Sequence, residues 1–119
     1  MLRDADFLVL HDPEVDNSTT GSGPVADLTR REARSLRLRF GGGVSAAHPP
    51  LFSEVVALIG AQAYPTLLEL DLLTSRPLPW PRVEWLARAV EPVRDRVIFN
   101  GADWNLRRLS RVDPTLPMG

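Results

Sequence analysis

The sequence contains no cysteine, and all 14 of its basic residues are arginine, so lysine is absent as well. Without cysteine the chain can form no disulfide, offers no thiolate nucleophile and cannot bind zinc through sulfur. Without lysine it offers no side-chain amine for a Schiff base. Any chemistry of this chain must therefore come from histidine, carboxylates, hydroxyls and arginine.

Long apolar runs are absent too. The chain has no stretch of about 18 apolar residues, so no membrane span is expected. The apolar run at residues 7–10 has acidic residues on both sides, unlike a secretory signal, and a cytoplasmic location is expected. The formal net charge of −1 lacks the basic excess typical of nucleic-acid-binding proteins, so no nucleic-acid partner is expected.

The length and composition are those of a small globular domain. The chain has 119 residues, of which 44% are hydrophobic and 24% are charged. This length predicts one domain over residues 1–119. A complete (β/α)₈ barrel needs about 250 residues, so the chain is too short for one.

Strand-like and helix-like segments alternate along the chain. Residues 7–10 are a continuous apolar run, which predicts a strand buried on both faces of a parallel sheet. Further strands are predicted at residues 67–72 and 96–100, and residues 115–118 have the character of a strand beginning. This alternation predicts βαβ units, and therefore an α/β fold with a parallel sheet.

The first predicted helix begins at Thr29, where Thr-Arg-Arg-Glu is a capping box. Its apolar stripe is predicted to contain Ala33, Leu36 and Phe40. Three more helices are predicted at residues 52–61, at residues 83–94 and directly after Asp103. Residues 14–28 are polar and are interpreted as a loop, and the proline-rich residues 75–81 as irregular.

His11 and Asp12 follow the first predicted strand directly. Ligands of α/β folds gather at the carboxyl ends of strands, which favours a role in binding or catalysis. A histidine that merely ends the strand is the competing interpretation, and the sequence leaves both open.

Glu69 and Asp71 share one face of the predicted strand at residues 67–72. If they were buried without partners, each carboxylate would lower the stability of the fold by several kcal/mol, because it would lose its hydration. They either bind a hard cation, which prefers carboxylate oxygens, or lie on a face exposed to water. The spacing does not decide between the two.

Two other features favour structural interpretations. The loop at residues 16–23 is rich in hydroxyls and glycine, but it lacks both common phosphate-loop motifs, so it is interpreted as a solvated loop. The three tryptophans, Trp80, Trp85 and Trp104, are interpreted as packing residues.

In combination these segments resemble the glycerophosphodiester phosphodiesterase family. The segment LVLHDPEVDNSTTGSGPVADLT is similar to a family strand that ends in His-Asp and leads into D-R-T-T-x-G-x-G-x-V-x-x-L-T. PPLFSEVVALI resembles the family's P-T-L-x-E-x-L helix start, and LLELDL resembles its I-E-I-K strand. RVIFNGADWNLRRLSRVDPTLPMG resembles its S-F-D-x-x-x-L-x-x-L-x-x-L-x-P-x-x-P segment. The order agrees over nearly the whole chain.

The resemblance implies a partial TIM barrel of the phospholipase C-like phosphodiesterase type, with parallel strands from the middle of the barrel. Family members hydrolyse glycerophosphodiesters, small molecules of lipid metabolism, to glycerol 3-phosphate and an alcohol, with Mg²⁺ or Ca²⁺ as cofactor. His11 matches the second catalytic histidine of the family. Glu69 matches the metal-binding glutamate of the I-E-I-K strand.

The chain departs from the family pattern in two ways. Asp71 stands where the family has lysine and Asn17 where arginine is usual, so two positive charges near the expected phosphate are missing. The family's His-Arg, Pro-Glu-Asn-Thr and Glu-x-Asp segments have no counterpart before Phe7, so the ligand set is incomplete.

Two functions therefore stay open: a piece of a metal-dependent phosphodiesterase, or a truncated, non-catalytic remnant that serves as a binding or assembly module. Part of a barrel leaves sheet edges open, and self-association through these edges is expected.

Overall fold

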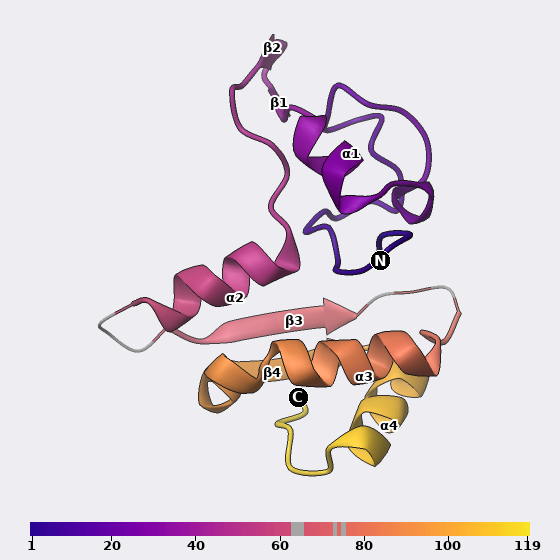
Figure 1. Cartoon of the computed structure of the whole chain (residues 1–119), viewed down its shortest axis with the longest axis vertical. Coiled ribbons are helices and arrows are strands. Elements are labelled where there is room, and N and C mark those ends of the chain that lie inside the picture. The colour runs from indigo at the N-terminus through magenta and orange to yellow at the C-terminus, as the bar shows by residue number, and fades with distance from the viewer. Residues whose placement is uncertain (63–65, 73, 75) are drawn as a thin grey trace. The chain divides into compact units, whose positions relative to one another are not determined.

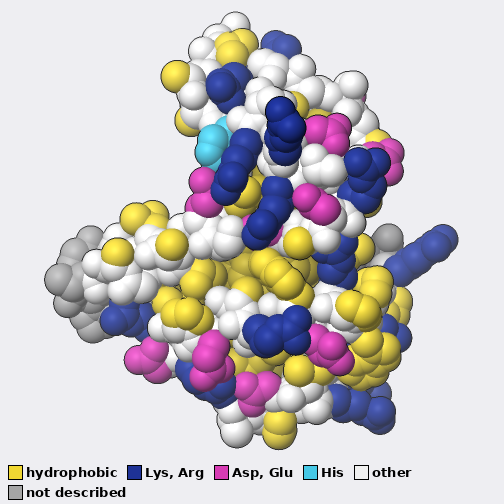
Figure 2. All heavy atoms as spheres, in the orientation of Figure 1, with side chains coloured by type: hydrophobic (Ala, Val, Ile, Leu, Met, Phe, Trp, Pro, Cys, Tyr) yellow, Lys and Arg dark blue, Asp and Glu magenta, His cyan; other side chains and the backbone are white. Residues whose placement is uncertain are grey.

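The computed structural model of the chain describes residues 1–62, 66–72, 74 and 76–119 (Figure 1). The chain divides into two compact units, Met1–Val55 and Val56–Gly119. On the face shown in Figure 2, basic and acidic side chains are interspersed. Within the described residues, no helix is long and apolar enough to cross a membrane.

The first unit contains little regular structure. A 3₁₀ helix η1 (Val25–Asp27) precedes helix α1 (Arg30–Ser35), and two short strands, β1 (Arg39–Phe40) and β2 (Gly43–Val44), pair antiparallel. The polar segment before α1 is a loop, as predicted, apart from η1 and isolated bridges. The core of this unit is a cluster of buried apolar side chains: Leu2, Leu8, Val15, Val25, Ala33, Leu36 and Leu51.

The predicted buried strand at residues 7–10 does not form. Leu8 makes one antiparallel bridge with Leu51, and Val9 is 46% exposed. The Val9 amide donates to the Pro50 carbonyl at 2.9 Å, but Pro50 has no N–H to return. The prolines at residues 49–50 thus limit the pairing of residues 7–10 with the segment before α2. The hydrophobic run alone could not show which segment it would pair with.

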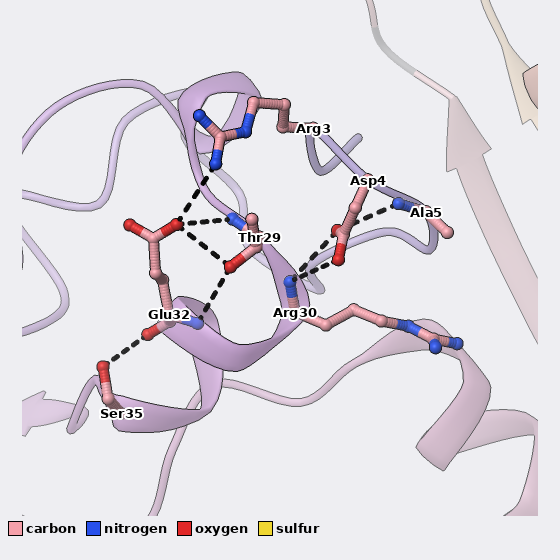
Figure 3. Close-up of polar contacts among 7 residues, drawn as sticks. All are labelled: Arg3, Asp4, Ala5, Thr29, Arg30, Glu32 and Ser35. Atoms are coloured by element: carbon pink, nitrogen blue, oxygen red, sulfur yellow. Dashed lines mark hydrogen bonds and ion pairs between the residues drawn. The ribbon is translucent and has the colours of Figure 1, made fainter.

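Helix α1 begins as the sequence predicts. The Thr29 hydroxyl accepts from the Glu32 amide at 3.2 Å, and the Glu32 carboxylate accepts from the Thr29 amide at 3.3 Å (Figure 3). The carboxylate of Asp4 accepts from the Arg30 amide at 3.1 Å and so satisfies another amide of the first turn.

Helix α1 is shorter than the predicted apolar stripe. Ala33 and Leu36 are buried as expected, but Leu36 already has extended backbone angles. Phe40 lies in β1 with 64% of its surface exposed, so its assignment to the stripe is wrong. The chain reverses at Gly41 and Gly42, both of which have positive φ.

Helix α2 (Phe52–Gly60) ends one residue before the predicted boundary. The second unit continues with strand β3 (Leu68–Leu72), helix α3 (Trp80–Ala89), the 3₁₀ helix η2 (Glu91–Arg96), strand β4 (Val97–Gly101) and helix α4 (Asp103–Val112). The predicted helix at residues 83–94 is thus split, and Pro92 lies at the start of η2. Its four predicted core positions, Val83, Leu86, Val90 and Val93, are all buried.

Strands β3 and β4 pair in parallel, as the alternation of strands and helices along the chain predicts. Leu70 lies opposite Phe99 in the register. Beyond β4, Met118 forms a parallel bridge with Phe99, which confirms the expected strand-like end of the chain. Helix α4 packs against both α3 and β4.

A close backbone contact joins the two parallel strands where β4 ends. Gly101 has φ of +123°, and a Cβ at this position would lie 2.6 Å from the Leu72 backbone nitrogen and oxygen. The Ala102 amide donates to the Leu72 carbonyl at 3.2 Å. Only glycine fits this junction without moving a strand.

Asn105, on the first turn of α4, is fully buried beside this junction. Its Oδ1 accepts from the Leu78 amide at 2.9 Å. Its Nδ2 donates to the Leu72 carbonyl at 3.1 Å and to the Thr74 hydroxyl at 2.8 Å. One side chain therefore ties the segment after β3 to α4. Ser75, the start of the segment predicted to be irregular, lies outside the described residues.

We expect Gly101→Ala to lower the free energy of unfolding by about 2 kcal/mol or more, because the new methyl group would overlap the Leu72 backbone at a positive φ. Urea denaturation followed by circular dichroism measures the loss. Gly60→Ala is the matched control, because its Cβ would meet only a Val93 methyl at 3.7 Å. Similar losses in both variants would contradict the proposed junction.

Candidate functional site

The carboxylates of β3 lie on its exposed face. Glu69 and Asp71 are exposed, whereas Leu68, Leu70 and Leu72 on the other face are partly buried. The structure thus places this face in water, and the metal-binding role of Glu69 stays a prediction.

Asn100 joins these carboxylates from the neighbouring strand. It lies opposite Asp71 in the register, and its Nδ2 donates a hydrogen bond to Glu69 Oε1. The two strands thus bring Glu69, Asp71 and Asn100 together on one face of the sheet. Side-chain oxygens of these types can bind a hard cation.

His11 belongs to the first unit, and 98% of its side chain is exposed. Its Nδ1 lies 3.1 Å from Asp12 Oδ1, an exposed pair within which the carboxylate orients the ring. His11 follows the single Leu8 bridge rather than a formed strand, so the expected position at a strand end is not reproduced. Its ring is open to a substrate from water.

The described residues do not complete a metal centre. Within them, no group of three or more histidine, aspartate or glutamate side chains could hold a metal ion. Glu69 and Asp71 supply two carboxylates, whereas Ca²⁺ takes six to eight oxygen ligands and Mg²⁺ six, some of them water. Further ligands would have to come from outside this group.

The hydroxyl-rich loop at residues 16–23 is braced by its own hydrogen bonds. The Gly23 amide donates to Asp16 Oδ1 at 2.8 Å, and the Gly21 amide donates to Thr19 Oγ1 at 3.0 Å. Thr19 is buried, and its hydroxyl donates to the Val15 carbonyl at 2.6 Å. Since these amides are already engaged, the loop is not arranged as a cradle for phosphate.

Asp6 is a buried carboxylate that the sequence did not reveal. It is fully buried, with φ of 73°, and its carboxylate accepts from the Ser53 amide at 3.2 Å and from the Ser53 hydroxyl. Arg30 Nε lies 3.5 Å from Asp6 Oδ2. Asp6 therefore fixes the first turn of α2 to the segment that leads to His11. Its partner Ser53 is 47 residues away, so no local pattern could indicate the contact.

A second charged group stabilises the segment that follows α4. Hydrogen bonds from Arg94 and Thr115 lower the pKa of Asp113 to about 2. Arg94 also contacts Glu91 at 2.8 Å. These contacts hold the end of the chain where it returns to β4.

The sequence was compared with family models and with curated proteins, and the second comparison found a relative. No family model matches the chain. A glycerophosphodiester phosphodiesterase of Caldanaerobacter subterraneus subsp. tengcongensis is 29% identical over 125 residues, an alignment that covers 100% of this chain and 50% of that protein. The chain thus spans about half the length of this curated relative.

Solved structures show the same fold. A glycerophosphodiester phosphodiesterase from Agrobacterium tumefaciens matches 98% of this chain with a TM-score of 0.76 and 18% identity, over 49% of its own chain. A glycerophosphoryl diester phosphodiesterase from Parabacteroides distasonis matches 98% with a TM-score of 0.74 and 20% identity, over 39% of its chain. The corresponding domain of a Mycobacterium tuberculosis protein gives a TM-score of 0.73 at 20% identity, covering 100% of this chain and 45% of that one.

The chain therefore has the fold of part of a phosphodiesterase of the TIM-barrel type, and the predicted fold class is confirmed. The predicted resemblance to glycerophosphodiester phosphodiesterases is confirmed as well.

We expect Asp6→Ala to destabilise the protein by about 2 kcal/mol, because the Ser53 amide and Arg30 would lose a buried acceptor. Asp6→Asn keeps one oxygen acceptor and should lose less. The matched control is Asp27→Ala, which removes an exposed carboxylate. Thermal unfolding measures all three, and equal destabilisation by Asp6→Ala and Asp27→Ala would contradict the role of Asp6.

Proposed function

We propose that this chain is part of a catalytic domain that hydrolyses glycerophosphodiesters to glycerol 3-phosphate and an alcohol. The observation that carries the proposal is the similarity over 100% of the chain to half of a glycerophosphodiester phosphodiesterase. The parallel pair that places Glu69 beside Asn100 supports it, because it brings oxygen-bearing side chains suited to a hard cation to one face of the sheet.

In this proposal His11 is a general acid–base residue. Its exposed ring can reach a substrate oxygen, and the neighbouring Asp12 carboxylate can orient it for proton transfer. Donating a proton to the leaving alcohol oxygen would lower the barrier to breaking its bond to phosphorus.

Glu69 is proposed as one ligand of Mg²⁺ or Ca²⁺. Its exposed carboxylate is a suitable hard ligand, with Asn100 as a neighbouring hydrogen-bond donor. Because the described residues do not complete the ligand set, no catalytic step is assigned to the metal. Asp71 and Asn17 add no positive charge for a phosphate, so arginine or the metal would have to neutralise it.

A cytoplasmic location is part of the same proposal. It follows the expectation drawn above from the apolar run at residues 7–10, which has acidic residues on both sides.

We predict that the isolated 119-residue chain has no detectable phosphodiesterase activity, because its ligand set is incomplete. The assay measures release of glycerol 3-phosphate from glycerophosphocholine with Mg²⁺ or Ca²⁺, with His11→Ala as the control for contaminating enzyme. Turnover that His11→Ala abolishes would contradict this prediction.

The second candidate is a non-catalytic remnant that acts as a binding or assembly module. The absence of a metal-binding cluster among the described residues favours it. The DNA upstream of the Met1 codon separates the two candidates. In-frame His-Arg, Pro-Glu-Asn-Thr and Glu-x-Asp segments would support the phosphodiesterase, and their absence would support the remnant.

Self-association through an open sheet edge is the other part of the proposal. In the described part of the chain β3 pairs only with β4, which leaves its second edge unpaired. Leu67, next to this strand, is 65% exposed. An unpaired edge with an apolar side chain beside it is a template for another strand.

We expect light scattering coupled to size-exclusion chromatography to show dimers or larger species that dissociate on dilution. Leu67→Lys should shift the protein toward monomer, because a charge beside the strand opposes edge pairing. Leu58→Lys makes the same change at an exposed position of α2 and should have no effect. A monomer at every concentration, or equal effects of both variants, would contradict edge pairing.

A further inference from the structure

The outer face of α4 combines tryptophan with arginine. Trp104, Arg107, Arg108 and Arg111 follow one another at intervals of three, one and three residues, so they lie on one face of the helix. Asn105 and Leu109 on the opposite face are buried. The outer face is therefore not needed for the core of this unit.

Trp80, the first residue of α3, extends this face. The Arg108 guanidinium carbon lies 4.9 Å from the centre of the Trp80 ring, a cation–π contact. Arg108 Nη1 also donates to the Leu78 carbonyl at 2.7 Å, which fixes the arginine over the ring. Trp80 and Trp104 nevertheless stay 39% and 43% exposed, so their interpretation as packing residues holds only in part.

These side chains surround a shallow hollow of about 540 Å³. Its lining consists of two tryptophans, three arginines, Pro77 and Ser110, and contains no carboxylate. We call the surface formed by its aromatic and basic residues the Trp–Arg face: Trp80, Trp104, Arg107, Arg108 and Arg111. Exposed tryptophan rings gathered beside arginines in this way indicate a binding face.

The positive charge of the Trp–Arg face is only weakly neutralised. Arg107 pairs with Asp103 at 2.7 Å, but both side chains are more than 70% exposed, so the pair is screened by water. Arg111 has no partner among the residues that the structure describes. Asp113 and Glu91 nearby are held by Arg94 instead.

We propose that the Trp–Arg face docks on an anionic lipid surface. The indole ring suits the boundary between headgroups and acyl chains because it is apolar with one polar N–H. Arginines on the same helix face would meet the negative headgroups, so charge complementarity selects this occupant. An acidic peptide would pair with the arginines alone, whereas a lipid surface also accepts the two exposed indole rings at its apolar boundary. The proposal does not depend on the proposed catalytic function.

Vesicles test this docking directly. We expect the 119-residue chain to sediment with vesicles of phosphatidylcholine and phosphatidylglycerol, but not with phosphatidylcholine alone. Binding should shift tryptophan fluorescence to shorter wavelength and weaken with added salt. The double variant R107Q/R111Q should weaken binding roughly thirtyfold, and Trp104→Ala should also weaken it. Circular dichroism checks that each variant is folded.

The double variant R31Q/R34Q is the matched control. It removes two exposed arginines of α1, so it makes the same change in net charge in the other unit. Absence of sedimentation with anionic vesicles, or equal losses in both double variants, would overturn the proposal. So would the same fluorescence shift with polyglutamate or inorganic phosphate and no vesicle binding, because the face would then bind an acidic peptide or a free anion.

Discussion

The close approach of β3 and β4 at Gly101 is the constraint on which the second unit depends. The Leu72 backbone leaves no room for a Cβ there, so the two strands can end side by side only if this residue is glycine. Asn105 then holds the Leu72 carbonyl and the segment that follows β3. With both strand ends fixed, the register that places Asn100 beside Glu69 follows.

Buried polar side chains play the same part in both units. Asp6 connects the N-terminal segment with the start of α2, and Asn105 connects the segment after β3 with α4. Asp6 accepts from the Ser53 amide and Asn105 from the Leu78 amide, so losing either side chain would remove the acceptor of a backbone amide. His11 lies five residues after Asp6, and Glu69 lies three residues before Leu72, whose carbonyl accepts from Asn105.

Local patterns in the sequence predicted the features that local forces determine. Residue spacing predicted the capping box at Thr29 and the buried positions of α3. The alternation of strand-like and helix-like segments predicted the parallel pairing of β3 with β4. The strand predicted at residues 7–10 does not form, because the segment beside it contains the prolines at residues 49–50. The apolar run itself carries no information about that neighbouring segment. Asp6 and Asn105 were missed because their partners lie 47 and 27 to 33 residues away, where no periodic pattern applies. The sequence singled out His11 by its place after an apolar run and Glu69 by its place on a strand face, but their specific roles came from the family resemblance and remain proposals.

The parallel register is the central claim, because it places Glu69, Asp71 and Asn100 on one face and because the predicted fold requires parallel strands. Nuclear magnetic resonance of the isolated chain measures it through contacts between backbone protons of β3 and β4. The account predicts contacts between Leu70 and Phe99 in a parallel arrangement, with Gly101 next to Leu72. Antiparallel contacts, or no contacts between the two segments, would contradict it.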